Sequence, residues 1–581
     1  MKQFLCVMLA MILAMILACG GCFAEAGEEA APEVKFRSEK MTMYVTDPQS
    51  PITFPVYFVN GVEDMPWADM ESWAKVLTGL YGEIYGQSGF EVTCTWEGEI
   101  LRLTRENGFY MEADFAEKTL YFNDYNGFLH VPGNVTPLLD LVTCSGFSPE
   151  GEPELFQRMI NRSFDRCGDA VRLNLGEYGI DMIHQGDYYL IPLQTMGDFT
   201  IAPALNVDTL FNGENLFLAK PEDLGNSRDG YTELGNMYYS GQPADRSPEL
   251  AEYGYHELCL VLDKLYGLKA IHGIDSFAQL FWQISFDESL SGTSAEDADA
   301  ALYNLLDFYL DDVHSYFAGY SRMTGKKDTE GMLGTATQKL EEYYDIYRTA
   351  RTESLGEDYP QYQEVGNTAY ITFDEFIGGK PGTYYEMAKE DQVPKDTIGL
   401  IIHAHKQICR EGSPIENVVL DLSNNTGGSV NAAVFVAAWF LGEAPLSVQN
   451  NFTGALSTAV YRADVNLDRE FDERDTVEDK NLYCLISPVS FSCGNMVPAL
   501  LKASERVTLL GRTSSGGSCT VQPLTSAWGT YFNISGPSRM SFQKNGSFYD
   551  IDQGVDPDFH ISRIRNFYDR EALTEYINGL F

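Results

Sequence analysis

Positive charge is scarce in this chain of 581 residues. Only 40 Lys and Arg stand against 84 Asp and Glu, which gives a formal net charge of -44. A surface with this charge repels phosphate backbones and anionic membranes, so we expect no nucleic-acid partner. The length predicts several units with separate cores rather than one, and no tandem repeat or low-complexity tract is present.

After the first 22 residues the chain has no cysteine pairs, and it has no cofactor motif. Three of the 11 cysteines lie in the first 22 residues, and the others are scattered singly, without a CxxC pair or a zinc spacing. The chain has no P-loop, no Rossmann fingerprint and no HExxH. His403 and His405 are two residues apart in an expected helix and do not share a face, so a satisfied, partly buried His405 fits better than a metal site. We therefore expect no cofactor and no metal.

An apolar run that approaches the length of a membrane span occurs only at the start of the chain. The stretch "MKQFLCVMLAMILAMILACGGCFAEAG" has one early Lys, an apolar run and then small residues, which is typical of a secretory signal over residues 1–26. We expect a secreted or cell-surface protein without an integral membrane domain. The "ILAC" ending at Cys19 leaves open whether a lipid anchors it. The oligomeric state does not follow from the sequence.

The residue pattern divides the mature chain into four parts. Residues 27–240 are rich in β-branched and aromatic runs separated by Gly, Asn and Asp, which predicts a β-rich region. Residues 247–325 have helical periodicity, and residues 326–360 form a polar connector. Strand and helix patterns then alternate over 361–570, which predicts an α/β layered core with a mostly parallel sheet. The motifs with candidate catalytic residues all follow residue 300, so we expect a chain starting near residue 245 to keep any activity.

Two strand ends in this core carry unusual residues. "VVLDLSNNTGGS" ends a strand in Gly427 and Gly428, whose N–H groups suit an oxyanion, although a plain strand-to-helix turn has the same pattern. "NLYCLISPVSFSCGNMVPALLKA" places Ser492 between a strand and a helix. This serine is a candidate nucleophile or simply a helix N-cap.

The joint order of four motifs resembles that of a known family. "VVLDLSNNTGG", "LISPVSFSCGNMVPALLKA", "VTLLGRTSSGG" and "GVDPDFHI" occur in the order found in the C-terminal processing protease (tail-specific protease) and tricorn-core family of serine peptidases, and "YLDDVHSYF" is similar to its helical histidine motif. The resemblance covers about residues 250 to 565. It implies a ClpP/crotonase-like core, a peptide or protein substrate, Ser492 as the nucleophile, and an oxyanion hole of the Cys493 N–H with Gly427 or Gly428.

Two departures from the family pattern direct the choice of base. Where the processing proteases carry a lysine, "SSGGSC" has Gly516 and Gly517, and Lys502 lies about 15 Å along the same helix as Ser492. About fifty residues between His314 and Gly366 leave no room for a PDZ domain. The chain is therefore more similar to the tricorn branch, where a histidine is the base.

His314 is then the expected base, with Ser315 shaping its surroundings. Asp552 is expected as the third member of the site, with Asp550 as its rival. Asp311 and Asp312 are expected on solvated faces. The predicted function is that of a secreted serine endopeptidase acting through an acyl-enzyme, and the alternative is a non-catalytic peptide-binding or envelope-binding protein on the same fold.

Overall fold

The computed structural model describes residues 34–85, 91–129, 138–144, 156–205, 207–226, 230–325, 331–379, 384–385 and 396–580. The predicted signal peptide, residues 1–26, lies outside these ranges. Among the described residues, no helix is both long and apolar enough to cross a bilayer.

Two large sheets lie in the N-terminal region, in line with the predicted β-rich composition. A seven-stranded sheet has the order β10-β11-β3-β2-β1-β13-β12, and a five-stranded antiparallel sheet has the order β4-β5-β6-β7-β9. The strands of the first sheet are β1 (Phe36–Val45), β2 (Asp47–Val59), β3 (Pro66–Asp69), β10 (Ile183–Gln185), β11 (Tyr188–Pro192), β12 (Asp208–Phe211) and β13 (Asn215–Ala219). Those of the second are β4 (Val92–Glu97), β5 (Ile100–Arg105), β6 (Tyr110–Asp114), β7 (Thr119–Phe122) and β9 (Val171–Asn174), and helix α2 (Met70–Tyr85) contacts both sheets.

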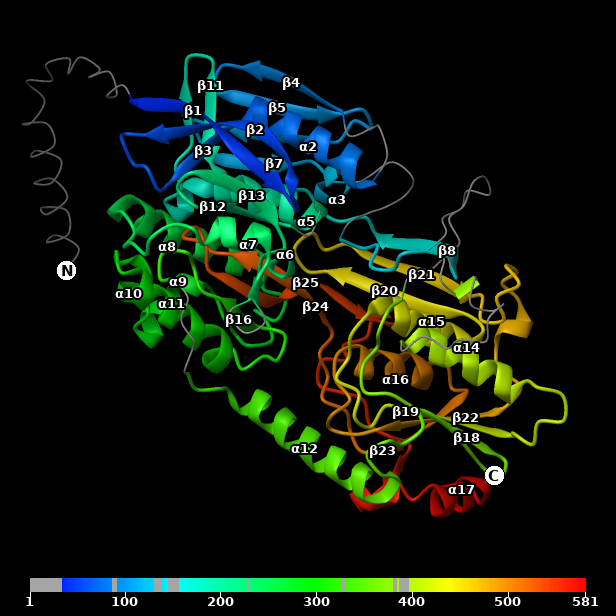
Figure 1. The fold of residues 1–581 in the computed structure, drawn as a ribbon. Coiled ribbons are helices and arrows are strands. Elements are labelled where there is room, and N and C mark those ends of the chain that lie inside the picture. Colours follow the sequence, from blue (N-terminus) through cyan, green and yellow to red (C-terminus); the bar gives the residue numbers. More distant parts are fainter. Residues whose placement is uncertain are drawn as a thin grey trace, which may run out of the picture.

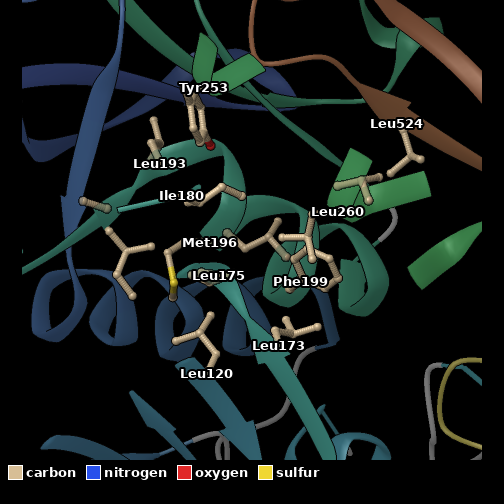
Figure 2. Close-up of a cluster of buried hydrophobic side chains, with 14 of the residues drawn as sticks. Leu120, Leu173, Leu175, Ile180, Leu193, Met196, Phe199, Tyr253, Leu260 and Leu524 are labelled. Atoms are coloured by element: carbon tan, nitrogen blue, oxygen red, sulfur yellow. The ribbon is translucent and has the colours of Figure 1, made fainter. Parts of the chain in front are cut away.

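A helical segment follows and packs against the N-terminal sheets. It consists of α8 (Pro248–Leu265), α9 (Phe277–Ile284), α10 (Asp287–Ser291), α11 (Ala295–Asn304) and the π-helical turn η3 (Leu305–Tyr309). Figure 2 shows Tyr253 and Leu260 of α8 in one buried cluster with Leu120 and Leu173 of the five-stranded sheet and with Leu524. The N-terminal region, the helical segment and a strand of the C-terminal half therefore share one hydrophobic core.

The C-terminal half contains the mostly parallel sheet that the alternating pattern predicts. Its order is β17-β18-β19-β22-β23-β28, and every pairing is parallel except β17 with β18. The strands are β17 (Tyr362–Val365), β18 (Thr368–Thr372), β19 (Asn417–Asp421), β22 (Asn481–Ile486), β23 (Val507–Gly511) and β28 (Phe559–His560). Alternate residues of β22 enter two different cores, Leu482 and Cys484 on one face and Tyr483 and Leu485 on the other. Burial on both faces explains why these strands are continuous apolar runs.

A layer of helices separates this sheet from a second one (Figure 1). The helices are α14 (Thr397–Ile408), α15 (Val430–Leu441) and α16 (Cys493–Ala503). The second sheet has the order β16-β25-β20-β21-β8, with β24 also paired to β25. Its strands are β8 (Gln157–Arg166), β16 (Tyr316–Gly319), β20 (Ala444–Asn450), β21 (Leu456–Ala463), β24 (Cys519–Thr525) and β25 (Tyr531–Ser541). Helix α15, "VNAAVFVAAWFL", is apolar on all sides and buried from Ala432 to Leu441, as expected for a helix in the middle of such layers.

Two further helices close the far face of the parallel sheet. These are α12 (Thr335–Leu355), which lies within the stretch expected as a connector, and α17 (Arg570–Asn578). Tyr347 of α12 and Leu573 of α17 pack with Tyr370 of β18 in one cluster. The core therefore has helices on both faces of its main sheet, which confirms the predicted α/β layered fold.

Candidate active site

Ser492 occupies the junction between the strand β22 and the helix α16 in an unusual conformation. It is the N-cap residue of α16, yet its φ of 55° and ψ of -124° lie outside the extended region that N-caps normally adopt. Its side chain accepts no hydrogen bond from the helix, while its N–H donates to the carbonyl of Gly516 at 2.9 Å. A positive φ is strained for a residue with a Cβ and marks functional turns. The N-cap interpretation of this serine therefore lacks its defining hydrogen bond.

Glycines allow two loops to meet at this serine. A Cβ built on Gly427, whose φ is 114°, would lie 2.6 Å from the Cβ of Ser492. A Cβ on Gly494 would lie 2.4 Å from the carbonyl oxygen of Asn425. Real Cβ atoms do not approach so closely, so the loop 425–428 reaches Ser492 only because side chains are absent at both positions.

Hydrogen bonds orient the backbone N–H groups beside Ser492. The Gly427 N–H donates to Asn425 Oδ1 at 3.0 Å, and the Gly427 carbonyl accepts from the Phe376 N–H at 2.7 Å. Because a trans peptide points its N–H opposite to its C=O, the Gly428 N–H is directed away from Phe376. Within the described residues, neither this N–H nor that of Cys493 in the first turn of α16 donates to a protein acceptor. These two groups are therefore available to a ligand.

The thiol of Cys493 also fixes the glycine loop. Cys493 Sγ donates to the carbonyl of Gly428 at 3.2 Å, and burial raises the pKa of this thiol to about 12. The thiol therefore stays protonated and can act as the donor. Asn425, Phe376 and this thiol are positioning groups that sequence reasoning missed. An Asn two residues before a Gly-Gly pair was the only available signal.

His314 lies in a turn and not on a helix. We expected "YLDDVHSYF" to be helical, but the helix ends with η3, Asp311 has a φ of 47°, and the next element is the strand β16. An α-helix cannot continue through a positive φ. The His314 side chain is only 6% exposed, and its ring centre lies 4.7 Å from that of Phe491, the residue before Ser492. The structure therefore places His314 and Ser492 in one neighbourhood, and the ring atom Nδ1 is buried without a hydrogen-bond partner.

Asp312 belongs to this neighbourhood and not to a solvated face, which corrects our expectation. Its carboxylate accepts from the His314 N–H at 3.1 Å and from Ser315 Oγ at 2.6 Å. Ser315 Oγ in turn accepts from the N–H of Ser535 on β25 at 3.0 Å. Burial lowers the pKa of His314 below 6.5, and the negative charges of Asp312 and then Asp552 oppose that shift. The companion residue Asp311 accepts from the Ala336 N–H at 2.7 Å, so it also has a structural contact.

The two candidate acids have different surroundings. Asp552 Oδ1 accepts from the N–H and the Oγ of Ser518, at 2.9 and 3.0 Å, and its charge acts on His314. Asp550 forms an ion pair with Arg539 at 2.5 Å, and its side chain is 50% exposed. Of these two candidates, Asp550 is paired with a cation, and Asp552 is the one whose charge, together with that of Asp312, acts on the imidazole.

The position expected for a lysine cannot hold one. Gly517 has a φ of 84°, and a Cβ built on it would lie 2.5 Å from the ring of Phe491. Lys502 points elsewhere, because its Nζ donates to the carbonyl of Asp556 at 2.6 Å and pairs with Asp558 at 3.2 Å. The aromatic ring that contacts His314 therefore fills the space of the missing side chain.

The two histidines of α14 are structural. His405 is buried, and its Nδ1 accepts from Trp439 Nε1 at 3.2 Å, as we expected for a satisfied histidine. The ring of His403 packs edge-on against Tyr362. Among the described residues, no group of three or more His, Cys, Asp or Glu side chains is arranged to hold a metal ion.

Solved structures that are similar to this chain include a lipoprotein and two proteases. A lipoprotein from Streptococcus agalactiae is 15% identical, with 57% of this chain and 95% of that chain covered and a TM-score of 0.34. A photosystem II D1 C-terminal processing protease is 17% identical over 35% of this chain and 47% of that chain, with a TM-score of 0.25. The tricorn protease is 10% identical over 96% of this chain and 73% of that chain, with a TM-score of 0.33. No curated protein matches the chain.

One part of the sequence matches a family of known proteins. Residues 367–561 match peptidase family S41, and this range contains Ser492, both glycines of the 427–428 turn and Asp552. His314 lies before the matched range. The predicted resemblance to this family of serine peptidases is therefore confirmed for residues 367–561.

Proposed function

We propose that this protein is a secreted serine endopeptidase in which Ser492 is the nucleophile and His314 is the base. The observation that carries the proposal is the conformation of Ser492. It is a strained N-cap residue whose hydroxyl does not cap its helix, and it adjoins two N–H groups that have no acceptor among the described residues. Family S41 membership supports a peptidase acting on a peptide or protein substrate. Secretion rests on the sequence pattern of residues 1–26.

The chemistry follows the usual acyl-transfer sequence. Ser492 Oγ attacks the peptide carbonyl carbon while His314 accepts the hydroxyl proton, and the N–H groups of Gly428 and Cys493 bind the resulting oxyanion. The intermediate collapses, the C–N bond breaks, and His314 gives its proton to the leaving amine. Water then hydrolyses the acyl-enzyme with His314 again acting as base. Asp552 stabilises the imidazolium that forms in both steps.

A covalent label tests the nucleophile. We expect a fluorophosphonate probe to modify the mature protein at Ser492, identified by mass spectrometry of the labelled peptide, because such probes select an activated hydroxyl beside an oxyanion hole. The Ser492→Ala variant is expected to take no label. Ser504 provides a matched control, since it also adjoins α16 but its hydroxyl donates to the Leu501 carbonyl, so Ser504→Ala should label fully. A folded wild-type protein that takes no label would favour the alternative, a non-catalytic binding protein.

A further inference from the structure

The side chain of one glutamate, Glu375, approaches a glycine of the proposed oxyanion hole. A Cβ built on Gly428 would lie 3.1 Å from Cγ of Glu375, the atom to which the carboxyl carbon of Glu375 is bonded. The backbone on either side of this glutamate is anchored, since the Phe376 N–H donates to Gly427 and Thr397 Oγ1 donates to the Glu375 carbonyl at 3.1 Å. The side chain of Glu375 therefore starts from an anchored backbone and passes close to Gly428, the residue whose N–H would bind the scissile carbonyl.

The neighbouring acid shows what is different about Glu375. Asp374 forms a two-point ion pair with Arg351, at 2.5 and 2.6 Å, and the arginine side chain is buried. Glu375 is exposed, and within the described residues its carboxylate has neither a cation nor a hydrogen-bond donor. Of two adjacent acids at the edge of the site, one is neutralised and the other is open to an incoming ligand.

We infer that Glu375 makes the site selective for peptides with Lys or Arg next to the scissile bond. This inference rests on the proposed function and adds the substrate class. A peptide whose carbonyl oxygen accepts from the Gly428 N–H places its flanking side chains within reach of Glu375. A cationic side chain gains an ion pair there, while an acidic one meets a like charge. Because the pair stays partly hydrated, the gain is about two- to fivefold in kcat/KM.

Cleavage-site mapping tests this selectivity. Reduced and alkylated lysozyme serves as an unfolded substrate, and mass spectrometry identifies the two residues on each side of every cut. For the wild-type protein we expect a two- to fivefold enrichment of Lys and Arg at one of these positions, smaller in 500 mM than in 20 mM NaCl because salt screens the pair. The enrichment is lost in Glu375→Gln. It persists in Glu575→Gln, an exposed glutamate on α17 that controls for general attraction to this acidic protein.

A binding measurement separates this inference from the proposed function. Ser492→Ala is titrated with two fluorescein-labelled decapeptides that differ only by arginine or its neutral isostere citrulline at one central position. We expect the arginine peptide to bind two- to fivefold more tightly, and the difference to vanish in the double variant Ser492→Ala/Glu375→Gln. Equal affinity in the first protein, or a difference that survives in the second, overturns the role of Glu375. Absence of hydrolysis by the wild type overturns only the proposed function, because this arm needs no turnover.

Discussion

The polar cluster around Asp299 and the polar cluster around Ser492 are both buried. They differ in the share of their polar atoms that form hydrogen bonds. Around Asp299 every acceptor is used: Oδ1 accepts from Trp528 Nε1 at 2.8 Å and from Thr530 Oγ1, and Oδ2 accepts from Thr324 Oγ1 at 2.6 Å. Around Ser492, the hydroxyl does not cap its helix, and one buried nitrogen of the His314 imidazole has no hydrogen-bond partner in the part of the chain that the structure describes.

The difference separates a structural cluster from a chemical one. Leaving a buried polar group unpaired costs about 1–3 kcal/mol, and a strained backbone costs a similar amount. A fold tolerates such costs where a ligand later supplies the missing partner. The comparison therefore predicts that changes at the Ser492 cluster remove activity, whereas changes at the Asp299 cluster remove stability.

The largest effect is expected at His314. The change His314→Ala removes the base that accepts the Ser492 proton, so kcat should fall by about three to six orders of magnitude, as for loss of a triad member. Because Nδ1 has no partner to lose, the midpoint of thermal unfolding should change by only a few degrees. Peptide hydrolysis and circular dichroism provide the two measurements. Near-full activity in a folded variant would falsify the assignment of the base.

The glycine loop provides the second test, with a matched control. Gly427→Ala adds a Cβ that would lie 2.6 Å from the Ser492 Cβ, so we expect at least a hundredfold loss of kcat/KM. Gly412 also has a positive φ, of 73°, but nothing lies within 4 Å of a Cβ built there. Gly412→Ala should therefore cost about 1 kcal/mol of unfolding free energy and leave kinetics unchanged. Equal kinetic losses in both variants would show that backbone strain, and not contact with Ser492, controls activity.

The two candidate acids form the third test. Asp552→Asn removes a charge that acts on His314, and we expect kcat to fall by about two to four orders of magnitude. Asp550→Asn breaks a half-exposed ion pair with Arg539 and should change kcat less than threefold. Both variants are assayed with one fluorogenic peptide. The reverse order of effects would assign the third position to Asp550.

The structural cluster is expected to show the opposite pattern. Asp299→Asn replaces one carboxylate oxygen with an NH2 group, which then faces the donor groups of Trp528 or Thr324. This should lower the free energy of unfolding by about 1–3 kcal/mol. At temperatures where the variant is folded, kcat/KM should stay within a few-fold of the wild type. Urea unfolding gives the first value and peptide hydrolysis the second. A large kinetic loss without destabilisation would place Asp299 in the active site.

Local patterns predicted the core, and the resemblance of the ordered motifs to a peptidase family pointed to the residues of the candidate site. Continuous apolar runs identified the strands β18, β19, β22 and β23, and the Gly-Gly turn and the serine after β22 are the residues that meet at the site. The turn conformation of His314 was not predictable, because "YLDDVHSYF" has helical periodicity and only the positive φ of Asp311 ends the helix. The role of Asp312 as an acceptor for His314 and Ser315 depends on that turn.

Contacts between distant segments were beyond sequence reasoning. The strand β8, residues 157–166, pairs with β21, residues 456–463, and no pattern in either strand specifies the other. The shared core in Figure 2 likewise joins the N-terminal sheets to α8 and to Leu524. A chain starting near residue 245 would expose this apolar surface, so its expected activity now depends on whether it still folds.

The smallest effect concerns pH and tests the surroundings of His314. An unperturbed histidine pKa of about 6.5 alone would place the acid limb of kcat/KM between roughly pH 6 and 7.5. Burial lowers the pKa of His314, so the neutral base persists to lower pH and the acid limb should lie below pH 6.5. Because the unfolded chain then binds this proton more readily, the same group also lowers the stability of the fold as pH falls below about 6.5.

Asp312→Asn sharpens this last prediction. It removes a negative charge that raises the pKa of His314, so the acid limb should move further down, by a fraction of a pH unit. Profiles of kcat/KM from pH 4 to 9 for the wild type and this variant measure both shifts. The change Asp311→Asn is the control, because Asp311 contacts the Ala336 N–H and does not act on the imidazole. If the acid limb of kcat/KM lies well above pH 7, and if Asp312→Asn does not shift it, the base is a group other than His314.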